Sequence, residues 1–421
     1  MRAALCVLLL CLLVLPAVAL QIVEFCPDPY RSGDPDEYIV LEGEGSLAGY
    51  TVTDGEGGFR FPAGACIQGR LVVARDAAAY ERTYGTLPHY ELFDHSPLVP
   101  EVIRGDDLRM GNERDELVLL ANGEEIQRVS WPGDVHPREG QIHFLEEGVW
   151  DPRVLLIGQS RFPPATFHDV SLTAFAAPDA SLEVFYAAVR DADDEILVNV
   201  YEFTSPDLAL ALADASARGV QVRMLLEGGP VGGIAPAERY VCSLMMESGI
   251  PIHQMSSGGD AHPKYRFNHA KYMVIDGEGL FITSENFKEN GFPPAGSSGN
   301  RGWGVYLESP ALAEYFREVF LWDSSGGDIV PMDVHGGSYA PPVYAPYTVE
   351  FPPARFEGAT VTAVLAPDTS RLIREMLEGA ETSIDIEQAY ITNRTPAEPN
   401  PFLAAAIEAA RRGVKVRVLL D

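Results

Sequence analysis

The most informative stretch of the chain reads NHAKYMVID at residues 268–276 and is followed by GLFITSEN at residues 279–286. Both segments carry β-branched and aromatic residues and flank an Asp-Gly pair, which predicts two strands joined by a hairpin turn. Side chains alternate between the two faces of a strand, so His269 and Lys271 are expected on the same face. The stretch therefore predicts a sheet that presents a histidine and a lysine together.

This pair suits phosphoryl chemistry. A neutral imidazole can attack phosphorus while a fixed ammonium neutralises the phosphate oxygens. Ser284 and Asn286, again two residues apart, offer a hydroxyl and an amide to the same oxygens. Each residue alone has an ordinary explanation, because a lone strand histidine usually belongs to a partly buried core and an Asp before a Gly usually makes a turn. The combination is far rarer than its parts and predicts a phosphate site.

Charge is distributed unevenly around this stretch. The 421 residues include 31 Lys and Arg against 61 Asp and Glu, a net charge of −30, which disfavours broad attraction to nucleic acid or anionic membrane. Lysine occurs only four times, and Lys264, Lys271 and Lys288 lie within 25 residues. A small positive patch is therefore predicted, made of Lys264, Arg266 and Lys271.

A metal site is a weaker interpretation of the same region. His253, His262 and His269 are spaced by nine and seven residues, unlike the short ligand spacings of zinc sites, and no cysteine pair accompanies them. The sequence therefore predicts neither a metal nor a cofactor.

The surrounding sequence predicts an α/β layer structure. Helical patterns at residues 181–192 and 208–218 alternate with buried-strand runs at residues 196–200 and 220–226. This pattern occurs twice in the chain. Residues 217–227 (ARGVQVRMLLE) correspond to residues 411–421 (RRGVKVRVLLD), and an Ala-Pro-Asp triplet precedes both copies. The second copy stops after its second strand, which predicts a truncated second unit; the alternative is a protein that ends there.

The first 19 residues predict a secretory signal peptide. Arg2 precedes an apolar run at residues 3–15, and Ala17-Val18-Ala19 forms a cleavage site after Pro16. The alternative, an uncleaved anchor, is disfavoured because a spanning helix needs about 20 apolar residues. We therefore expect a secreted or cell-surface protein with no integral membrane span after signal removal.

Residues 20–150 show short strand runs separated by turn signals, which favours a β-sandwich. The exported chain would keep three cysteines, Cys26, Cys66 and Cys242. In an oxidising compartment a Cys26–Cys66 disulfide within this domain is predicted, with Cys242 as a buried free thiol.

The central stretch resembles the H-x-K-x4-D signature of the phospholipase D superfamily and its downstream G-S-x-N element. The matching residues are His269, Lys271, Asp276, Ser284 and Asn286. The resemblance covers about residues 170–330 and, in part, 360–421. It implies that His269, Lys271 and Asp276 are catalytic, that Ser284 and Asn286 bind the phosphate, and that no metal is needed.

Two positions depart from this pattern. Thr283 replaces the glycine of the second element, and Gly302 stands where the family often has the Glu of an Asn-x-Glu sequence that supports the histidine. The second departure weakens the expectation of a well-oriented histidine unless another carboxylate substitutes.

The N-terminal region resembles a lamin-tail domain, through residues 23–29, 36–41, 47–50 and 112–120. This resemblance implies an immunoglobulin-like sandwich that binds or tethers the protein to a surface. The resulting fold class is a multidomain chain: a signal peptide (1–19), a lamin-tail-like β-sandwich (20–150), an α/β phospholipase D-like domain (165–332), a linker (333–358) and the truncated start of a second phospholipase D-like repeat (359–421).

Two functions follow from these patterns. The first is an exported phosphodiesterase that acts on phospholipid or nucleic acid through a phosphohistidine at His269, with the histidine of a second motif protonating the leaving group. The second is a non-catalytic, secreted surface-binding protein with a degenerate phospholipase D-like domain, which Gly302 and the missing second motif favour. If the gene continues, the repeat places a second motif roughly 35–60 residues beyond Asp421; otherwise two copies of the chain would have to pair.

Overall fold

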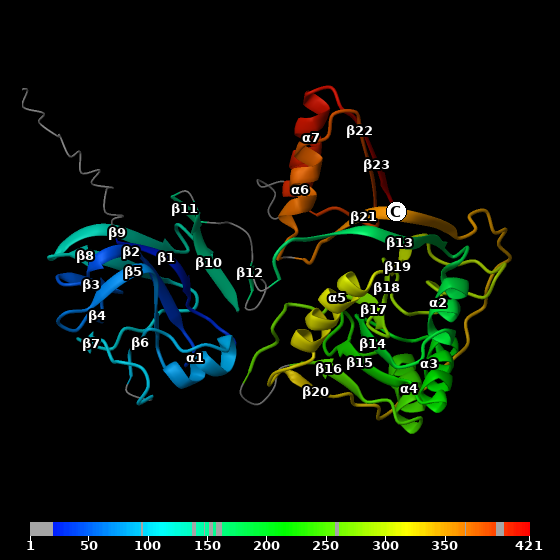
Figure 1. Cartoon of the computed structure of the whole chain (residues 1–421), viewed down its shortest axis with the longest axis horizontal. Helices are drawn as coiled ribbons and strands as arrows, with labels where there is room; N and C mark the ends of the chain where they lie inside the picture. The colour runs from blue at the N-terminus through cyan, green and yellow to red at the C-terminus, as the bar shows by residue number, and fades with distance from the viewer. Residues whose placement is uncertain are drawn as a thin grey trace, which may run out of the picture. The chain divides into compact units, whose positions relative to one another are not determined.

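The computed structural model describes residues 20–93, 96–136, 140–146, 148–150, 155–156, 162–256, 261–366, 368–392 and 400–421. The chain forms two compact units, Met1–Ile157 and Gly158–Asp421 (Figure 1). The predicted signal peptide lies outside the described residues. Within the described residues, no helix has both the length and the apolar content needed to cross a membrane.

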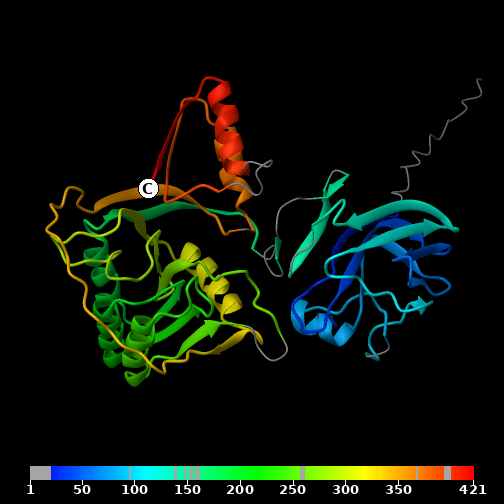
Figure 2. The same ribbon diagram turned by 180° about the vertical axis from the view of Figure 1, so that it is seen from behind.

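The first unit is rich in β-strands, as predicted (Figure 2). One helix, α1 (Ala77–Tyr84), was not predicted; the Asp76 side chain accepts a hydrogen bond from the Ala79 amide and caps its first turn. The strands are β1 (Gln21–Cys26), β2 (Tyr38–Ser46), β3 (Tyr50–Thr53), β4 (Gly58–Arg60), β5 (Cys66–Ala74), β6 (Tyr90–Glu91), β7 (Ile103–Arg104), β8 (Asp115–Ala121), β9 (Glu124–Trp131), β10 (Gln141–Glu146), β11 (Val149–Trp150) and β12 (Leu155–Leu156).

These strands form two sheets around one apolar core. One sheet has the order β11-β10-β1-β2-β5-β6, with β12 also paired to β10, and the other has the order β7-β4-β3-β8-β9. Phe25 and Leu41 from the first sheet and Phe59 and Leu119 from the second belong to the same buried cluster. The immunoglobulin-like type of this arrangement stays a prediction.

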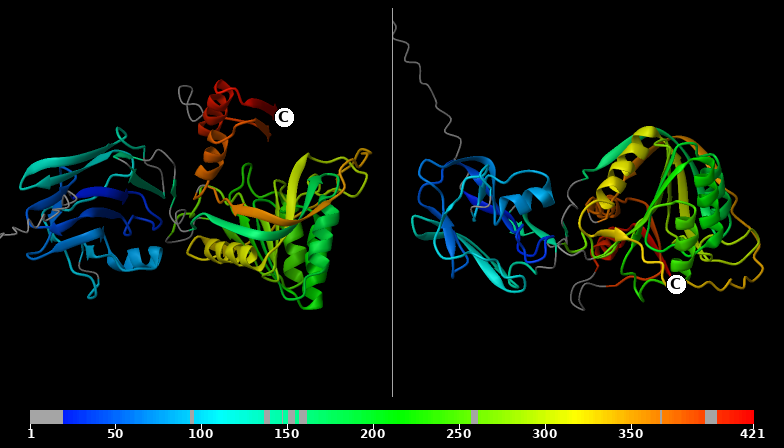
Figure 3. Two further views of the ribbon diagram at one scale, coloured as in Figure 1. Left: turned by 45° about the horizontal axis from the view of Figure 1, so that its top comes forward. Right: turned by 90° about the horizontal axis from the view of Figure 1, so that it is seen from below.

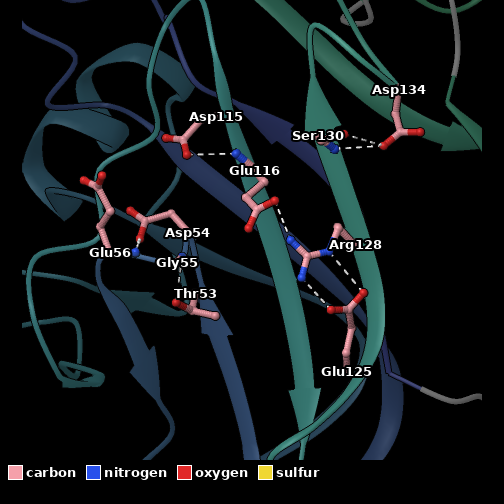
Figure 4. Close-up of polar contacts among 10 residues, drawn as sticks. All are labelled: Thr53, Asp54, Gly55, Glu56, Asp115, Glu116, Glu125, Arg128, Ser130 and Asp134. Atoms are coloured by element: carbon pink, nitrogen blue, oxygen red, sulfur yellow. Dashed lines mark hydrogen bonds and ion pairs between the residues drawn. The ribbon is translucent and has the colours of Figure 1, made fainter.

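Polar contacts between neighbouring strands lie on the surface of this unit (Figure 4). Arg128 on β9 pairs with Glu116 on β8 and with Glu125. The Asp54 carboxylate accepts the Glu56 amide and closes the turn between β3 and β4. Exposed ion pairs of this kind contribute about 0–1 kcal/mol each, so the shared apolar core stabilises the unit more than they do.

The predicted Cys26–Cys66 disulfide is wrong. Both residues are free thiols, and Cys242 is a buried free thiol, as predicted. Cys26 pairs with Tyr38 at one end of β2, whereas Cys66 pairs with Ser46 at the other end. Eight residue steps along an extended strand span about 26 Å. A disulfide requires Cα atoms within about 7 Å, so the sheet register keeps the two thiols apart.

The second unit is a nine-stranded mixed sheet with helices on both faces (Figure 3). Its strand order is β20-β16-β15-β14-β17-β18-β19-β13-β21. The strands are β13 (Ala165–Ala177), β14 (Glu195–Val200), β15 (Gln221–Glu227), β16 (Ile252–Met255), β17 (Lys271–Ile275), β18 (Gly279–Thr283), β19 (Gly302–Glu308), β20 (Ile329–Pro331) and β21 (Ala354–Ala363); the helices are α2 (Ser181–Arg190), α3 (Pro206–Arg218), α4 (Pro236–Glu247) and α5 (Pro310–Asp323).

The alternating side chains of the central strands divide between two cores. Val198 and Met273 pack with α2, α3 and α4 on one face, and Leu197 and Val274 pack with α5 on the other. The predicted α/β alternation and the β17–β18 hairpin are confirmed. A strand buried on both faces explains why β14 reads as an almost continuous apolar run.

The segment predicted as a linker is held against this unit. Its end, from residue 354 onward, belongs to β21, which pairs with β13. Before that strand, the Tyr347 amide donates to the Gly296 carbonyl at 2.8 Å. The buried Asp179 carboxylate accepts the Glu350 amide at 2.7 Å and the Arg301 guanidinium at 2.7 Å. The linker prediction is therefore wrong for residues 354–358, because strand pairing incorporates them into the sheet.

The C-terminal segment has the same element order as the first α/β part. It contains α6 (Arg371–Glu378), β22 (Ser383–Gln388), α7 (Pro401–Arg411) and β23 (Lys415–Leu420). β22 and β23 pair in parallel, as β14 and β15 do. Its identity as a second phospholipase D-like unit stays a prediction.

The separated cysteines give a test of the first unit. We expect a thiol reagent to label Cys66 in the folded protein, because its side chain is exposed, and to leave Cys26 unlabelled, because that side chain is fully buried and its burial raises the pKa of the thiol. Mass spectrometry of native and denatured samples after alkylation measures the labelling of both cysteines. A Cys26–Cys66 linked peptide in protein isolated under non-reducing conditions would contradict the register.

Candidate active site

His269 and Lys271 lie side by side, as the spacing predicts. Lys271 is the first residue of β17, and His269 lies two residues before it, outside the strand. The Lys271 Nζ atom lies 3.4 Å from Nδ1 of His269 and donates to the His269 carbonyl at 3.2 Å. The ring of Tyr201, the residue after β14, lies 4.7 Å from the imidazole ring and 5.5 Å from the Lys271 ammonium. The site therefore places an imidazole and an ammonium group next to the same aromatic ring.

Buried polar groups fix the residue before His269. The Asn268 amide donates to Glu227 Oε2 at 2.5 Å, and its side-chain Nδ2 donates to Asn199 Oδ1 at 2.8 Å. Asn199 and Glu227 come from the carboxyl-terminal halves of the parallel strands β14 and β15, whose ends meet at one edge of the sheet. Sequence reasoning missed both residues; the only signal was that Glu227 ends the repeated strand.

The charges around the pair set its protonation. Partial burial, followed by the charge of Lys271, lowers the pKa of His269 below its usual value, although nearby Glu202 opposes the shift. The imidazole is therefore mainly neutral at pH 7. Burial lowers the pKa of Lys271 to about 8, and the carboxylates of Glu202 and Glu285 oppose this shift. The pair thus holds a neutral base beside a largely protonated lysine.

Asn286 lies in the site but its amide is engaged. Its Nδ2 donates to Glu202 Oε2 at 3.0 Å, and Lys288 pairs with the other oxygen of the same carboxylate at 3.2 Å. The Asn286 Oδ1 atom is buried without a hydrogen-bond partner among the described residues. Glu202 was not predicted, while the lysine clustering signalled Lys288. As placed, Asn286 would have to release Glu202 before it could donate to a phosphate.

Ser284 is exposed, but its hydroxyl is engaged within the protein. It follows β18 and is exposed, and its Oγ accepts the Trp303 amide at 3.0 Å. The hydroxyl also forms a hydrogen bond with the Glu285 carboxylate, which lowers the pKa of that group. A serine hydroxyl has one proton to donate, so Ser284 would have to release Glu285 before it could donate to a phosphate oxygen.

Asp276 is separated from the pair. It follows the last residue of β17, five residues and roughly 16 Å of extended strand from Lys271. Its carboxylate accepts the amides of Asp193, Asp194 and Glu195 at 2.9, 2.8 and 2.9 Å. We therefore correct its predicted catalytic role to a structural one: Asp276 ties the β17–β18 turn to the start of β14.

The predicted positive patch is also smaller than expected. Lys264 is 5% exposed and forms a buried ion pair with Asp328, with Nζ and Oδ1 3.1 Å apart. Its charge is compensated inside the fold. Arg266 is exposed next to Phe267, whereas Lys271 is half-buried, so Arg266 is the exposed member of the predicted patch.

Comparison with known proteins places the site within a recognised domain type. Residues 186–324 match the family described as cardiolipin synthase, PLD-like domain. No curated protein matches the chain.

Solved structures similar to this chain include Nuc, a phospholipase D family member from Salmonella typhimurium, at 23% identity and a TM-score of 0.33 over 40% of this chain and 99% of that chain. NucT from Helicobacter pylori matches at 14% identity and a TM-score of 0.32, over 40% of this chain and 100% of that chain. Phosphatidylserine synthase from Haemophilus influenzae Rd KW20 matches at 11% identity and a TM-score of 0.30, over 39% of this chain and 40% of that chain. The family match places a phospholipase D-like domain at residues 186–324, which include His269 and Lys271.

Proposed function

We propose that this protein is an exported phosphodiesterase that hydrolyses phosphodiester bonds through a phosphohistidine at His269. The observation that carries the proposal is the contact between a mainly neutral imidazole and a lysine ammonium, 3.4 Å apart, inside a phospholipase D-like domain. The pattern of residues 1–19 supports export.

The reaction has two steps. In the first, a ring nitrogen of His269 attacks phosphorus, a P–N bond forms, and the P–O bond to the leaving group breaks. In the second, water attacks the phosphohistidine, the P–N bond breaks, and the imidazole is regenerated. Lys271 neutralises charge on the non-bridging oxygens in both steps, and the Ser284 hydroxyl, after it releases the Glu285 carboxylate, donates to one of them.

The leaving oxygen must take a proton when the first P–O bond breaks. The resemblance assigns this proton to the histidine of a second motif, which would then take a proton from the attacking water. That histidine would lie in the predicted second phospholipase D-like unit, so the proposed mechanism includes this unit.

Phospholipid and nucleic acid are both proposed substrate classes, because each presents the same diester to the pair. The matching family description names a cardiolipin synthase, and one similar structure is a phosphatidylserine synthase, so lipid must be tested alongside nucleic acid. The first unit, in this proposal, tethers the enzyme to a surface as its resemblance to lamin-tail domains implies.

The first test removes the nucleophile. We expect His269→Ala to lower the hydrolysis rate by about 10⁴-fold or more. Because His269 is an exposed residue that belongs to neither apolar core of this unit, the thermal midpoint should stay within the error of the wild type. The assay uses bis(p-nitrophenyl) phosphate, phosphatidylglycerol vesicles and single-stranded DNA. His335→Ala is the matched control, since that side chain is 97% exposed and lies outside the site.

Substantial turnover by His269→Ala would remove this residue from the nucleophile role. Wild-type protein that binds one of these diesters but hydrolyses none would instead favour the non-catalytic binding protein.

The second test concerns Lys271 and the dependence on pH. The rate should rise with pH as His269 loses its proton, at a pKa below 6.5, and should fall as Lys271 loses its proton near pH 8. Lys271→Arg should lose about 10²-fold in rate, because a forked guanidinium replaces a compact ammonium. Its residual activity should show no fall near pH 8, since arginine stays charged. If the rate of this variant still falls near pH 8, the deprotonation of Lys271 is not the cause of that fall.

A further inference from the structure

An exposed arginine next to the site is not neutralised by the fold. The guanidinium of Arg266 makes no hydrogen bond or ion pair with the residues that the structure describes. The other described arginines of the second unit each bind a carboxylate or a backbone carbonyl, as Arg223 binds Glu195 at 2.9 Å and Arg301 binds Asp179 at 2.7 Å. In a chain with a net charge of −30, such an arginine can serve an anionic ligand.

Aromatic rings connect this arginine to the candidate site. The Arg266 Cζ atom lies 5.8 Å from the centroid of the half-buried Phe267 ring. The Phe267 ring meets the Tyr201 ring edge-on, with their centroids 6.2 Å apart. The Tyr201 ring is the one that contacts His269 at 4.7 Å and Lys271 at 5.5 Å. Arg266 and Phe267 therefore adjoin the site through one shared ring.

Tyr201 is held in place at both ends. Its hydroxyl accepts the Val231 amide at 2.7 Å, and its backbone amide donates to the Ala270 carbonyl at 2.9 Å. The residue is 7% exposed. Arg266 precedes His269 by three residues, which span at most about 11 Å between Cα atoms. A phosphate at Arg266 and a phosphate at His269 would therefore belong to nearby positions of one ligand.

A guanidinium beside a partly exposed aromatic ring suits single-stranded nucleic acid. The guanidinium fork binds a phosphate through two hydrogen bonds, and the ring offers a surface on which a nucleobase stacks. Phosphates and bases alternate along a single strand, where pairing does not cover the bases.

A lipid surface fits the same residues less well. A glycerol headgroup has no planar group for Phe267, and the net charge of −30 disfavours an anionic vesicle. Val231, which is 82% exposed, supplies one apolar side chain near Tyr201, less than the contiguous apolar patch that marks a membrane-binding surface.

We propose that Arg266 and Phe267 form a subsite for a nucleotide next to the scissile phosphate, and that the substrate of this site is single-stranded nucleic acid. Arg266 binds the phosphate of that nucleotide, and its base packs against the exposed part of the Phe267 ring. Lys271 faces the scissile phosphate. The inference rests on the proposed function and adds no bond-breaking step to it, because the subsite acts through binding.

Binding tests the subsite without turnover. In His269→Ala protein, the fluorescence anisotropy of a labelled hexathymidylate gives Kd over a range of salt concentrations. We expect Arg266→Gln in this background to weaken binding about tenfold and to reduce the slope of log Kd against log salt by about 0.7, the value for one phosphate contact on a single strand. Phe267→Leu should weaken binding about tenfold and leave the slope unchanged, because it removes stacking and no charge.

Arg60→Gln is the matched control. Arg60 is an exposed arginine of the first unit, and its substitution changes the net charge by the same amount. We expect Kd for the hexathymidylate to stay within about twofold of the parent protein, since nucleic acid affinity depends on the phosphates that are contacted. Thermal midpoints verify that each variant is folded.

Turnover separates the subsite from the reacting groups. Bis(p-nitrophenyl) phosphate has one phosphate and no neighbouring nucleotide, so Arg266→Gln should leave its kcat/KM within about twofold of the wild type. On hexathymidylate the same variant should lose about tenfold in kcat/KM, mainly through KM.

Three results would overturn the inference. The first is a folded Arg266→Gln variant that binds hexathymidylate as tightly as its parent. The second is an equal loss of affinity in Arg60→Gln, which would reduce the effect to general charge. The third is His269→Ala protein that binds phosphatidylglycerol vesicles but not the oligonucleotide, which would favour a lipid. Wild-type protein that is inactive on every diester would overturn the proposed function alone, because the anisotropy measurement still decides whether the subsite exists.

Discussion

The buried carboxylate of Glu227 fixes the backbone next to the candidate site. One oxygen accepts the Asn268 amide at 2.5 Å and the other accepts the Gly229 amide at 2.7 Å, and burial raises the pKa of the group. Asn268 is bound from its other side by Asn199, so two neighbouring parallel strands fix the backbone directly before His269. A buried polar group without such partners would cost about 1–3 kcal/mol, which makes this arrangement specific.

Each clustered lysine has its own local partner, although the chain is strongly acidic overall. The lysines that cluster in sequence have different roles: Lys264 is buried with Asp328, Lys288 pairs with Glu202, and Lys271 contacts His269. Because Glu202 and Glu285 both face Lys271, its positive charge persists in spite of burial. The balance leaves the imidazole mainly neutral next to a cation, which is the protonation state that nucleophilic attack on a phosphodiester requires.

The departures of this chain from the family pattern are coupled in space. Gly302 lacks the side chain expected there, and Glu285 fills the volume, supported by Thr283. Residues 283, 285 and 302 come from adjacent strands β18 and β19, whose register pairs Thr283 with Gly304. The sheet register therefore places Glu285 in the volume next to Gly302.

The sequence by itself determined what depends on local periodicity: the α/β alternation, the β17–β18 hairpin, the β-rich first unit, and the shared face of His269 and Lys271. The tertiary structure decided what depends on which strands are neighbours. It bound Asp276 to the amides at the start of β14, separated Cys26 from Cys66 along β2, and brought Glu202, Glu227 and Glu285 to the site. Side-chain alternation is fixed by the covalent geometry of one strand, whereas contacts between distant residues depend on the register of the whole sheet.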